Sequence, residues 1–91
     1  MNPDKICQQY AEKKPKIKIG VKDDMVFIEG TAQSLEFLGE IFIAQSSFKK
    51  DCAFHMGPNC AGKIFFKPSS THGIYIHRLP CMEKKNKNIF K

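Results

Sequence analysis

Residues 32–48 read AQSLEFLGEIFIAQSSF, and this stretch decides the fold because its apolar positions recur with the period of an α-helix. On a helical wheel Glu36, Glu40 and Ser47 lie on one side, and Ile43 falls among these polar positions. The other half of the wheel is apolar and holds Leu35, Phe37, Leu38, Ile41, Phe42, Ala44 and Phe48. The stretch therefore predicts one amphipathic helix, roughly Ala32 to Phe48, that packs on one face of a sheet.

The residues before this helix predict a β-hairpin. Apolar and basic residues alternate from Lys16 to Lys22, which is the period of a half-buried strand. Asp23-Asp24 is a plausible turn, because Asp tolerates turn conformations and bonds to nearby backbone. Residues 25–29 (MVFIE) then read as a second strand that pairs antiparallel with the first. Thr31 or Ser34 is expected to cap the following helix.

The residues after the helix predict further strands. Cys52 to Met56 reads as a short strand that ends before the turn Gly57-Pro58-Asn59. Residues 63–67 (KIFFK) form a possible short strand, and residues 73–79 (GIYIHRL) are rich in strand-forming residues and end at Pro80. The expected order is β-β-α-β-(β)-β. We therefore expect an α+β domain in which one helix packs on a single, mainly antiparallel sheet of four to five strands.

Chain length and composition predict one domain. A chain of 91 residues builds one hydrophobic core. We divide it into an N-terminal segment at 1–15, the α+β core at 16–81 and a basic C-terminal tail at 82–91. No apolar run approaches the roughly 18 residues that span a bilayer, and the start MNPDK has no apolar signal region. We therefore expect a cytoplasmic protein with no membrane partner.

The net charge of +6 favours an acidic partner. Lysines concentrate in residues 13–22 and 84–91. Such a charge attracts nucleic acid, an anionic membrane or an acidic protein surface. The alternative is a solvated strand edge followed by a basic tail.

Cysteine and histidine residues form the most metal-like pattern in the sequence. Cys52, His55, Cys60, His77 and Cys81 offer the ligand types that zinc prefers. However, Cys52 and His55 are three residues apart on a predicted strand, so their side chains point to opposite faces. We therefore expect no metal ligands and no cofactor. Without an export signal, we also expect reduced thiols rather than disulfides.

Two other patterns have a chemical interpretation. His55 and His77 would act as an acid–base pair if their strands were neighbours, but no nucleophile motif, phosphate-binding loop or acidic cluster accompanies them, so we expect no enzymatic activity. Basic and aromatic residues alternate around Phe65 and Phe66, and again around Tyr75 and Arg78. Such residues stack bases and hold phosphates in sheet-based RNA-binding proteins. A small RNA- or DNA-binding protein is therefore the alternative function.

The order of features resembles the small bacterial immunity proteins of immunity protein family 32. The resemblance rests on Ile28-Glu29-Gly30-Thr31-Ala32-Gln33-Ser34-Leu35 with Leu38, on Cys52-Ala53-Phe54-His55-Met56-Gly57-Pro58, and on Ser70-Thr71 followed by Ile74, Ile76, His77 and Arg78. It covers about residues 17–79. The chain departs from the family pattern at Phe54 and Gly57, where a His or Asp would be expected, and in the tail from Glu83.

This resemblance implies an antitoxin that neutralises a bacterial toxin domain by binding and occluding it, without catalysis or cofactor. Immunity proteins against nucleases are commonly acidic, whereas this chain is basic. Its toxin is therefore expected to present an acidic patch, or an apolar interface with charge at the rim. Aromatic and Arg side chains are favoured anchors. The expected partner contacts are Phe65, Phe66, Tyr75, His77, Arg78 and His55.

Overall fold

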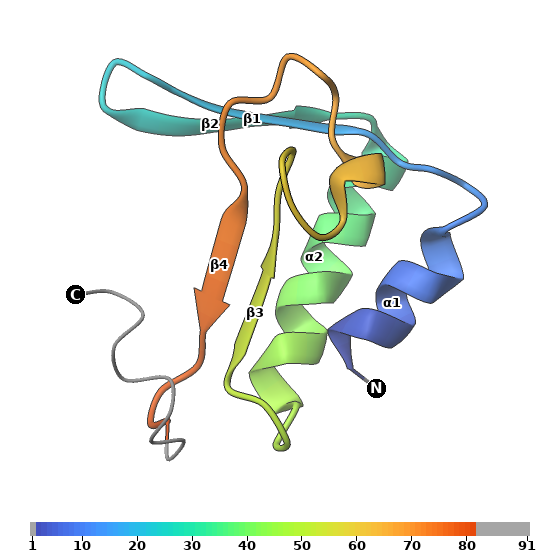
Figure 1. Cartoon of the computed structure of the whole chain (residues 1–91), viewed down its shortest axis with the longest axis vertical. Coiled ribbons are helices and arrows are strands. Elements are labelled where there is room, and N and C mark those ends of the chain that lie inside the picture. The colour runs from blue at the N-terminus through green and yellow to red at the C-terminus, as the bar shows by residue number, and fades with distance from the viewer. Residues whose placement is uncertain (1, 82–91) are drawn as a thin grey trace.

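A computed structural model describes residues 2–81 of the chain. Its elements follow the order α1 (Pro3–Tyr10), β1 (Ile17–Lys22), β2 (Met25–Gly30), α2 (Ala32–Ser47), β3 (Ala53–Met56), a 3₁₀ helix η1 (Lys63–Phe65) and β4 (Ile74–His77) (Figure 1). β1 and β2 form one two-stranded antiparallel sheet, and β3 and β4 form another. The predicted basic tail at 82–91 lies outside the described residues.

The structure is α+β, but the predicted single sheet of four to five strands packed by one helix is wrong. The edge of β1 that faces away from β2 is occupied by an irregular segment rather than a strand. The backbone N–H of Lys67 donates to the carbonyl of Ile17 at 2.8 Å, and that of Thr71 donates to the carbonyl of Ile19 at 3.0 Å. Ser70 Oγ accepts from the N–H of Ile19 at 3.1 Å. Since these groups are taken, neither β3 nor β4 pairs with β1.

The hairpin forms as the alternation predicts. Ile17 and Ile19 are buried on one face of β1, and the register pairs Lys22 with Met25 across the turn. Asp23 and Asp24 both have positive φ values, 53° and 62°. This is the backbone of a two-residue turn whose twist matches the flanking strands. In Figure 1 the turn projects past β4, beyond the elements that the hairpin covers.

The sequence pattern allows a helical turn before Pro15, and the structure forms an eight-residue helix there, α1. Asn2 caps it, its side chain accepting from the N–H of Lys5 at 2.9 Å, and Pro3 fits the first turn. Ile6 and Tyr10 are one turn apart and both are buried. The Tyr10 hydroxyl donates to the Glu40 carboxylate, which joins α1 to α2.

α2 agrees closely with the predicted helix, because Thr31 caps its start and Phe48 is its C-cap residue. The Thr31 hydroxyl accepts from the N–H of Ser34 at 3.1 Å. Its buried side includes Phe37, Leu38, Ile41 and Ala44. The predicted apolar arc is only partly covered, because Leu35 and Phe42 are each 46% exposed. Ile43, which lies outside that arc, is 70% exposed.

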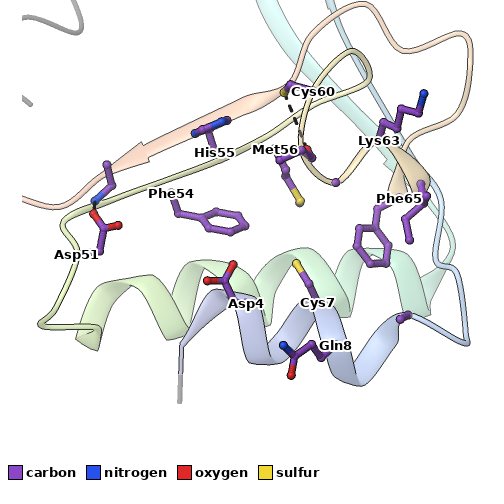
Figure 2. A pocket seen from close by; sticks show the side chains of 15 residues that line it. Asp4, Cys7, Gln8, Asp51, Phe54, His55, Met56, Cys60, Lys63 and Phe65 are labelled. Carbon is purple, nitrogen blue, oxygen red and sulfur yellow. Dashed lines mark hydrogen bonds between the residues drawn. The ribbon is translucent and has the colours of Figure 1, made fainter.

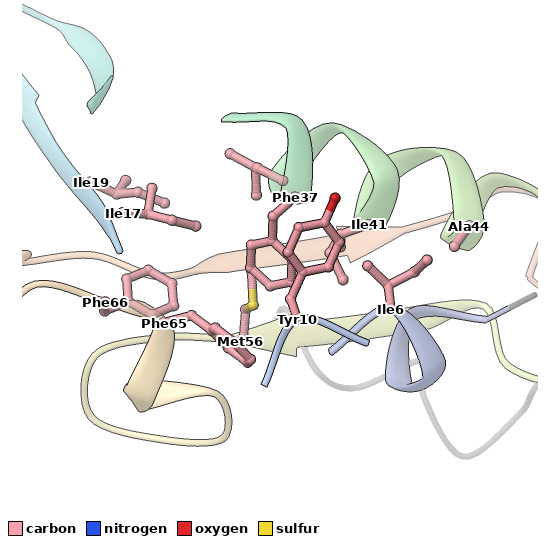
Figure 3. Packing of buried hydrophobic residues seen from close by; sticks show 11 residues of the cluster. Ile6, Tyr10, Ile17, Ile19, Phe37, Ile41, Ala44, Met56, Phe65 and Phe66 are labelled. Carbon is pink, nitrogen blue, oxygen red and sulfur yellow. The ribbon is translucent and has the colours of Figure 1, made fainter. Parts of the chain in front are cut away.

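The core lies between the two helices, the hairpin and the second sheet (Figure 3). Phe37 is fully buried, and its ring centroid lies 5.0 Å from that of Tyr10 and 4.6 Å from that of Phe65. Each of these rings comes from a different element. The cluster consists of Ile6, Tyr10, Ile17, Ile19, Phe37, Leu38, Ile41, Ala44, Met56, Phe65 and Phe66.

Cys52 and Cys81 form a disulfide, so the expectation of reduced thiols is wrong for this pair. The register of the second sheet explains the proximity. β3 and β4 pair from Ala53 with His77, and the N–H of Arg78 donates to the carbonyl of Cys52 at 2.7 Å. This brings the chain just before β3 beside the chain just after β4. Cys7 and Cys60 are free thiols.

Candidate partner-binding surface

His55, Tyr75 and His77 are the predicted contact residues that the structure brings together. The register of β3 and β4 pairs His55 with Tyr75, and strand alternation puts His77 on the same face as Tyr75. The His55 and Tyr75 rings are stacked with centroids 6.1 Å apart, and the Tyr75 and His77 rings meet edge to face at 6.4 Å. The outer face of the second sheet therefore carries a row of rings.

Phe65 and Phe66 lie in the core, each only 3% exposed, so neither side chain is available to a partner on this surface. The reason is local. Residues 63–65 form a 3₁₀ turn instead of a strand, and Phe66 then forms an isolated bridge with Ile17. Two adjacent residues of a strand point to opposite faces, whereas here both rings turn inward.

Arg78 is half-buried, and its guanidinium bonds to the chain's own backbone. Its Nη1 donates to the carbonyl of Phe48, and also to those of Gln45 at 3.3 Å and Asp51 at 3.2 Å. Carbonyls in the last turn of a helix have no partner within the helix. A guanidinium at this end also interacts favourably with the helix dipole. Arg78 therefore closes α2 and ties it to the end of β4.

The sequence interpretation missed an exposed apolar surface on the hairpin, which we call the hairpin surface: Val21, Met25, Val26 and Ile28. Their exposed fractions are 55%, 65%, 68% and 42%. The signal was present, because positions 25–28 (MVFI) are apolar without interruption. A half-buried strand shows alternation, so an unbroken run predicts that both faces need cover. Within β1 and β2, only Ile17, Ile19 and Gly20 are buried, and all three are on β1.

β2 also presents an unpaired edge. Its sheet contains only β1 and β2, so no strand among residues 2–81 pairs with the far side of β2. In a hairpin with a two-residue turn, the pair that closes the turn, Lys22 with Met25, is hydrogen-bonded. Alternation then directs the backbone groups of Val26 and Ile28 outward. Such groups are a template for adding a strand.

Basic residues lie on the neighbouring strand β1, one strand away from this edge. Lys18, Lys22 and Phe27 share the face of the hairpin that is opposite to Val21, and Lys18 Nζ lies 5.5 Å from the centroid of the Phe27 ring. Glu29 is opposite Lys18 in the register. The hairpin thus combines an apolar strand edge on β2 with positive charge on the adjacent strand β1, and this charge favours a partner of net negative charge.

A groove of about 750 Å³ lies on the other side of the molecule, between α1, β3 and the loop after it. Figure 2 shows Cys7, Phe54, Met56 and Phe65 lining it, with Asp4 and Gln8 on the α1 side. Burial, and then the Asp4 carboxylate, raise the pKa of the Cys7 thiol to about 11. The thiol is therefore protonated near neutral pH and is a poor nucleophile. The groove suits an apolar ligand group better than covalent chemistry.

Comparison with known protein families, curated proteins and solved structures gives no match to this chain. Among residues 2–81, no helix is both long and apolar enough to cross a membrane. The geometry of the surface therefore carries the functional argument alone.

Proposed function

We propose that this protein is an antitoxin of the immunity-protein type, which neutralises a bacterial toxin domain by binding it through the β2 edge. The observation that carries the proposal is the hairpin surface on an unpaired strand. Val26 and Ile28 expose apolar side chains where the backbone groups also point outward. Monomeric proteins rarely leave a contiguous apolar surface on an open edge, because it promotes association.

The expected binding mode is strand addition. A strand of the toxin domain pairs with β2, its backbone supplying hydrogen bonds and its side chains contacting Val26 and Ile28 on one face and Met25 on the other. Lys18 and Lys22 lie on β1, one strand removed from the added strand, so they add positive charge near the interface rather than direct contacts. Binding of this kind blocks the toxin without chemistry in the antitoxin.

The alternative of nucleic-acid binding loses part of its support. It depended on adjacent Phe65 and Phe66 rings as a stacking platform, and both rings are buried. The ring row of His55, Tyr75 and His77 remains accessible only in part. Protein binding through the hairpin uses side chains that are already exposed, such as Val26 and Ile28.

The test begins with the gene next to this one. We expect it to encode a secreted protein whose C-terminal domain stops growth when produced in a bacterium, and whose effect is cancelled by co-production of this chain. Val26→Lys should weaken the complex by about tenfold or more, since burial of one such side chain contributes about 1.5–3 kcal/mol. Ile64→Lys is the matched control, because Ile64 is 50% exposed but lies on η1.

Both variants replace exposed side chains, so their unfolding midpoints should match that of the unchanged chain. Equal protection by the unchanged chain and Val26→Lys would refute the β2 interface. An isolated housekeeping gene as neighbour, or nanomolar nucleic-acid binding with a steep salt dependence in a mobility-shift assay, would refute the antitoxin function itself.

A further inference from the structure

Cys52, His77 and Cys81 converge at the end of the second sheet. The two sulfur atoms and a ring nitrogen of His77 all lie within 4.8 Å of one another. They come from three different places: the residue before β3, the last residue of β4 and the segment after it. The hydrogen bond from the N–H of Arg78 to the carbonyl of Cys52 holds these places together.

The His77 ring has an unusual environment. Its Nε2 is shielded from solvent and has no hydrogen-bond partner among residues 2–81. Buried ring nitrogens are normally satisfied by a donor, an acceptor or an ordered ion. An imidazole nitrogen near two sulfur atoms is the ligand set that thiophilic metals prefer, and the unpartnered Nε2 leaves this ring without a competing hydrogen bond at that nitrogen.

We propose that reduction of the Cys52–Cys81 disulfide creates a binding site for a thiophilic d¹⁰ cation such as Zn²⁺, with both thiolates and the His77 ring as ligands. This set differs from the pair that the sequence pattern excluded. The exclusion rested on Cys52 and His55, whereas the fold brings together Cys52, His77 and Cys81, which belong to the same cysteine–histidine pattern. His55 lies on the same sheet face but outside the cluster.

The redox and proton balance is simple. A dithiol reductant supplies two electrons and two protons, the sulfur–sulfur bond breaks to give two thiols, and the dithiol becomes a disulfide. A phosphine reductant supplies the two electrons and becomes the phosphine oxide, while water supplies its oxygen and the two protons. Zn²⁺ then displaces both thiol protons, forming two Zn–S bonds and one Zn–N bond. The oxidised chain has no thiolate in the cluster and therefore should not bind the metal.

The geometry permits this change with small movements. Zn–S bonds of about 2.3 Å in a tetrahedral site separate two sulfurs by about 3.7 Å. The Cα atoms of Cys52 and Cys81 are 5.7 Å apart, so rotation of the two side chains can supply that separation without moving the strands. Three protein ligands leave a fourth position for water or a group from a partner.

The test uses the full chain, reduced with a phosphine that is then removed without oxygen. We expect it to bind one equivalent of Zn²⁺ in competition with a chromophoric chelator, at least a hundredfold more tightly than the oxidised chain does. Bound Zn²⁺ should protect Cys52 and Cys81 from iodoacetamide, as mapped by mass spectrometry. Cys60, which is an exposed free thiol, should still be alkylated.

Variants separate this site from adventitious binding. His77→Gln should weaken Zn²⁺ binding by tenfold or more, whereas His55→Gln and Cys60→Ser should leave it unchanged. His77→Gln keeps the disulfide, so an unchanged unfolding midpoint of its oxidised form shows that the fold is intact. Lowering the pH from 7.5 to 6.5 should weaken binding by up to about a hundredfold, because two protons are released.

The proposal is overturned by any of three results: Zn²⁺ affinity that His77→Gln leaves unchanged, equal affinity of the reduced and oxidised chains, or protection of Cys60 in place of Cys52 and Cys81. These readouts do not depend on toxin binding. The antitoxin proposal can therefore fail while this one holds, and the reverse.

Discussion

Replacement of Arg78 by alanine should destabilise the protein although the residue looks like a surface contact in the sequence. Its Nη1 faces the carbonyls of Gln45, Phe48 and Asp51. The nitrogen carries two hydrogens, so at most two of these bonds form fully at one time. A hydrogen bond to a charged group contributes about 1.5–3 kcal/mol, and Arg78 is only half-buried, so we expect a loss of about 2 kcal/mol in the free energy of unfolding.

Urea denaturation followed by far-ultraviolet circular dichroism measures this loss. For a domain of this size the slope is about 1 kcal/mol per molar urea, so the midpoint should fall by about 2 M. Arg78→Lys keeps the charge near the end of α2 but not the planar group, and should recover about 0.3–1 kcal/mol. The exposed Lys50 provides the control, since Lys50→Ala should change the stability by less than about 0.5 kcal/mol.

A loss below about 0.5 kcal/mol for Arg78→Ala would refute the assignment of Arg78 as a helix-closing residue. The same variant distinguishes the structural role from a role in binding. If Arg78 also contacts the partner directly, the alanine variant should bind the partner more weakly even under conditions in which the variant is fully folded.

Three further predictions concern the fold. Gly73→Ala should strongly destabilise the protein, because an added Cβ would lie 2.6 Å from the Cα of Gly57. Gly39→Ala should instead stabilise α2 by up to about 1 kcal/mol, because its Cβ would meet no atom within 4 Å. Thermal unfolding of the two variants measures this difference. The hydrogen bond to Glu40 raises the pKa of Tyr10 to about 12, so the folded state favours the neutral phenol. The resulting stabilisation is complete below pH 10 and is lost as the pH rises to about 12. When the free energy of unfolding is measured against pH, its fall between pH 10 and 12 should be smaller for Tyr10→Phe than for the unchanged chain. Phe37→Ala should cost about 3–5 kcal/mol in urea denaturation, because Phe37 is fully buried between two other rings, and a cost below 1 kcal/mol would contradict the described core.

Local patterns predicted the elements whose formation depends on their own residues. The alternation of Ile17, Ile19 and Val21 with lysines led to β1, and the two aspartates led to the turn. The period of residues 32–48 and the cap at Thr31 led to α2. In each case the information lies within one turn or one strand, so neighbouring residues suffice to find it.

The proposed binding surface was harder to predict because exposure is a property of the whole chain. Met25-Val26-Phe27-Ile28 is apolar in the sequence, which is equally consistent with burial on both faces and with a surface that awaits a partner. The opposite error concerned Phe65 and Phe66, which looked accessible beside lysines and are buried. Arg78 likewise looked like an anchor for a partner and bonds to α2 instead.

By itself the sequence determined the hairpin, the main helix and an overall basic charge, because periodicity, turn residues and charge are written in neighbouring positions. The tertiary structure decided that the strands form two sheets, since Ser70 and the segment around it occupy the free edge of β1 through contacts more than fifty residues apart. It also decided that Cys52, His77 and Cys81 meet while His55 stays apart. Such long-range contacts depend on the strand register between distant segments, which no local pattern specifies.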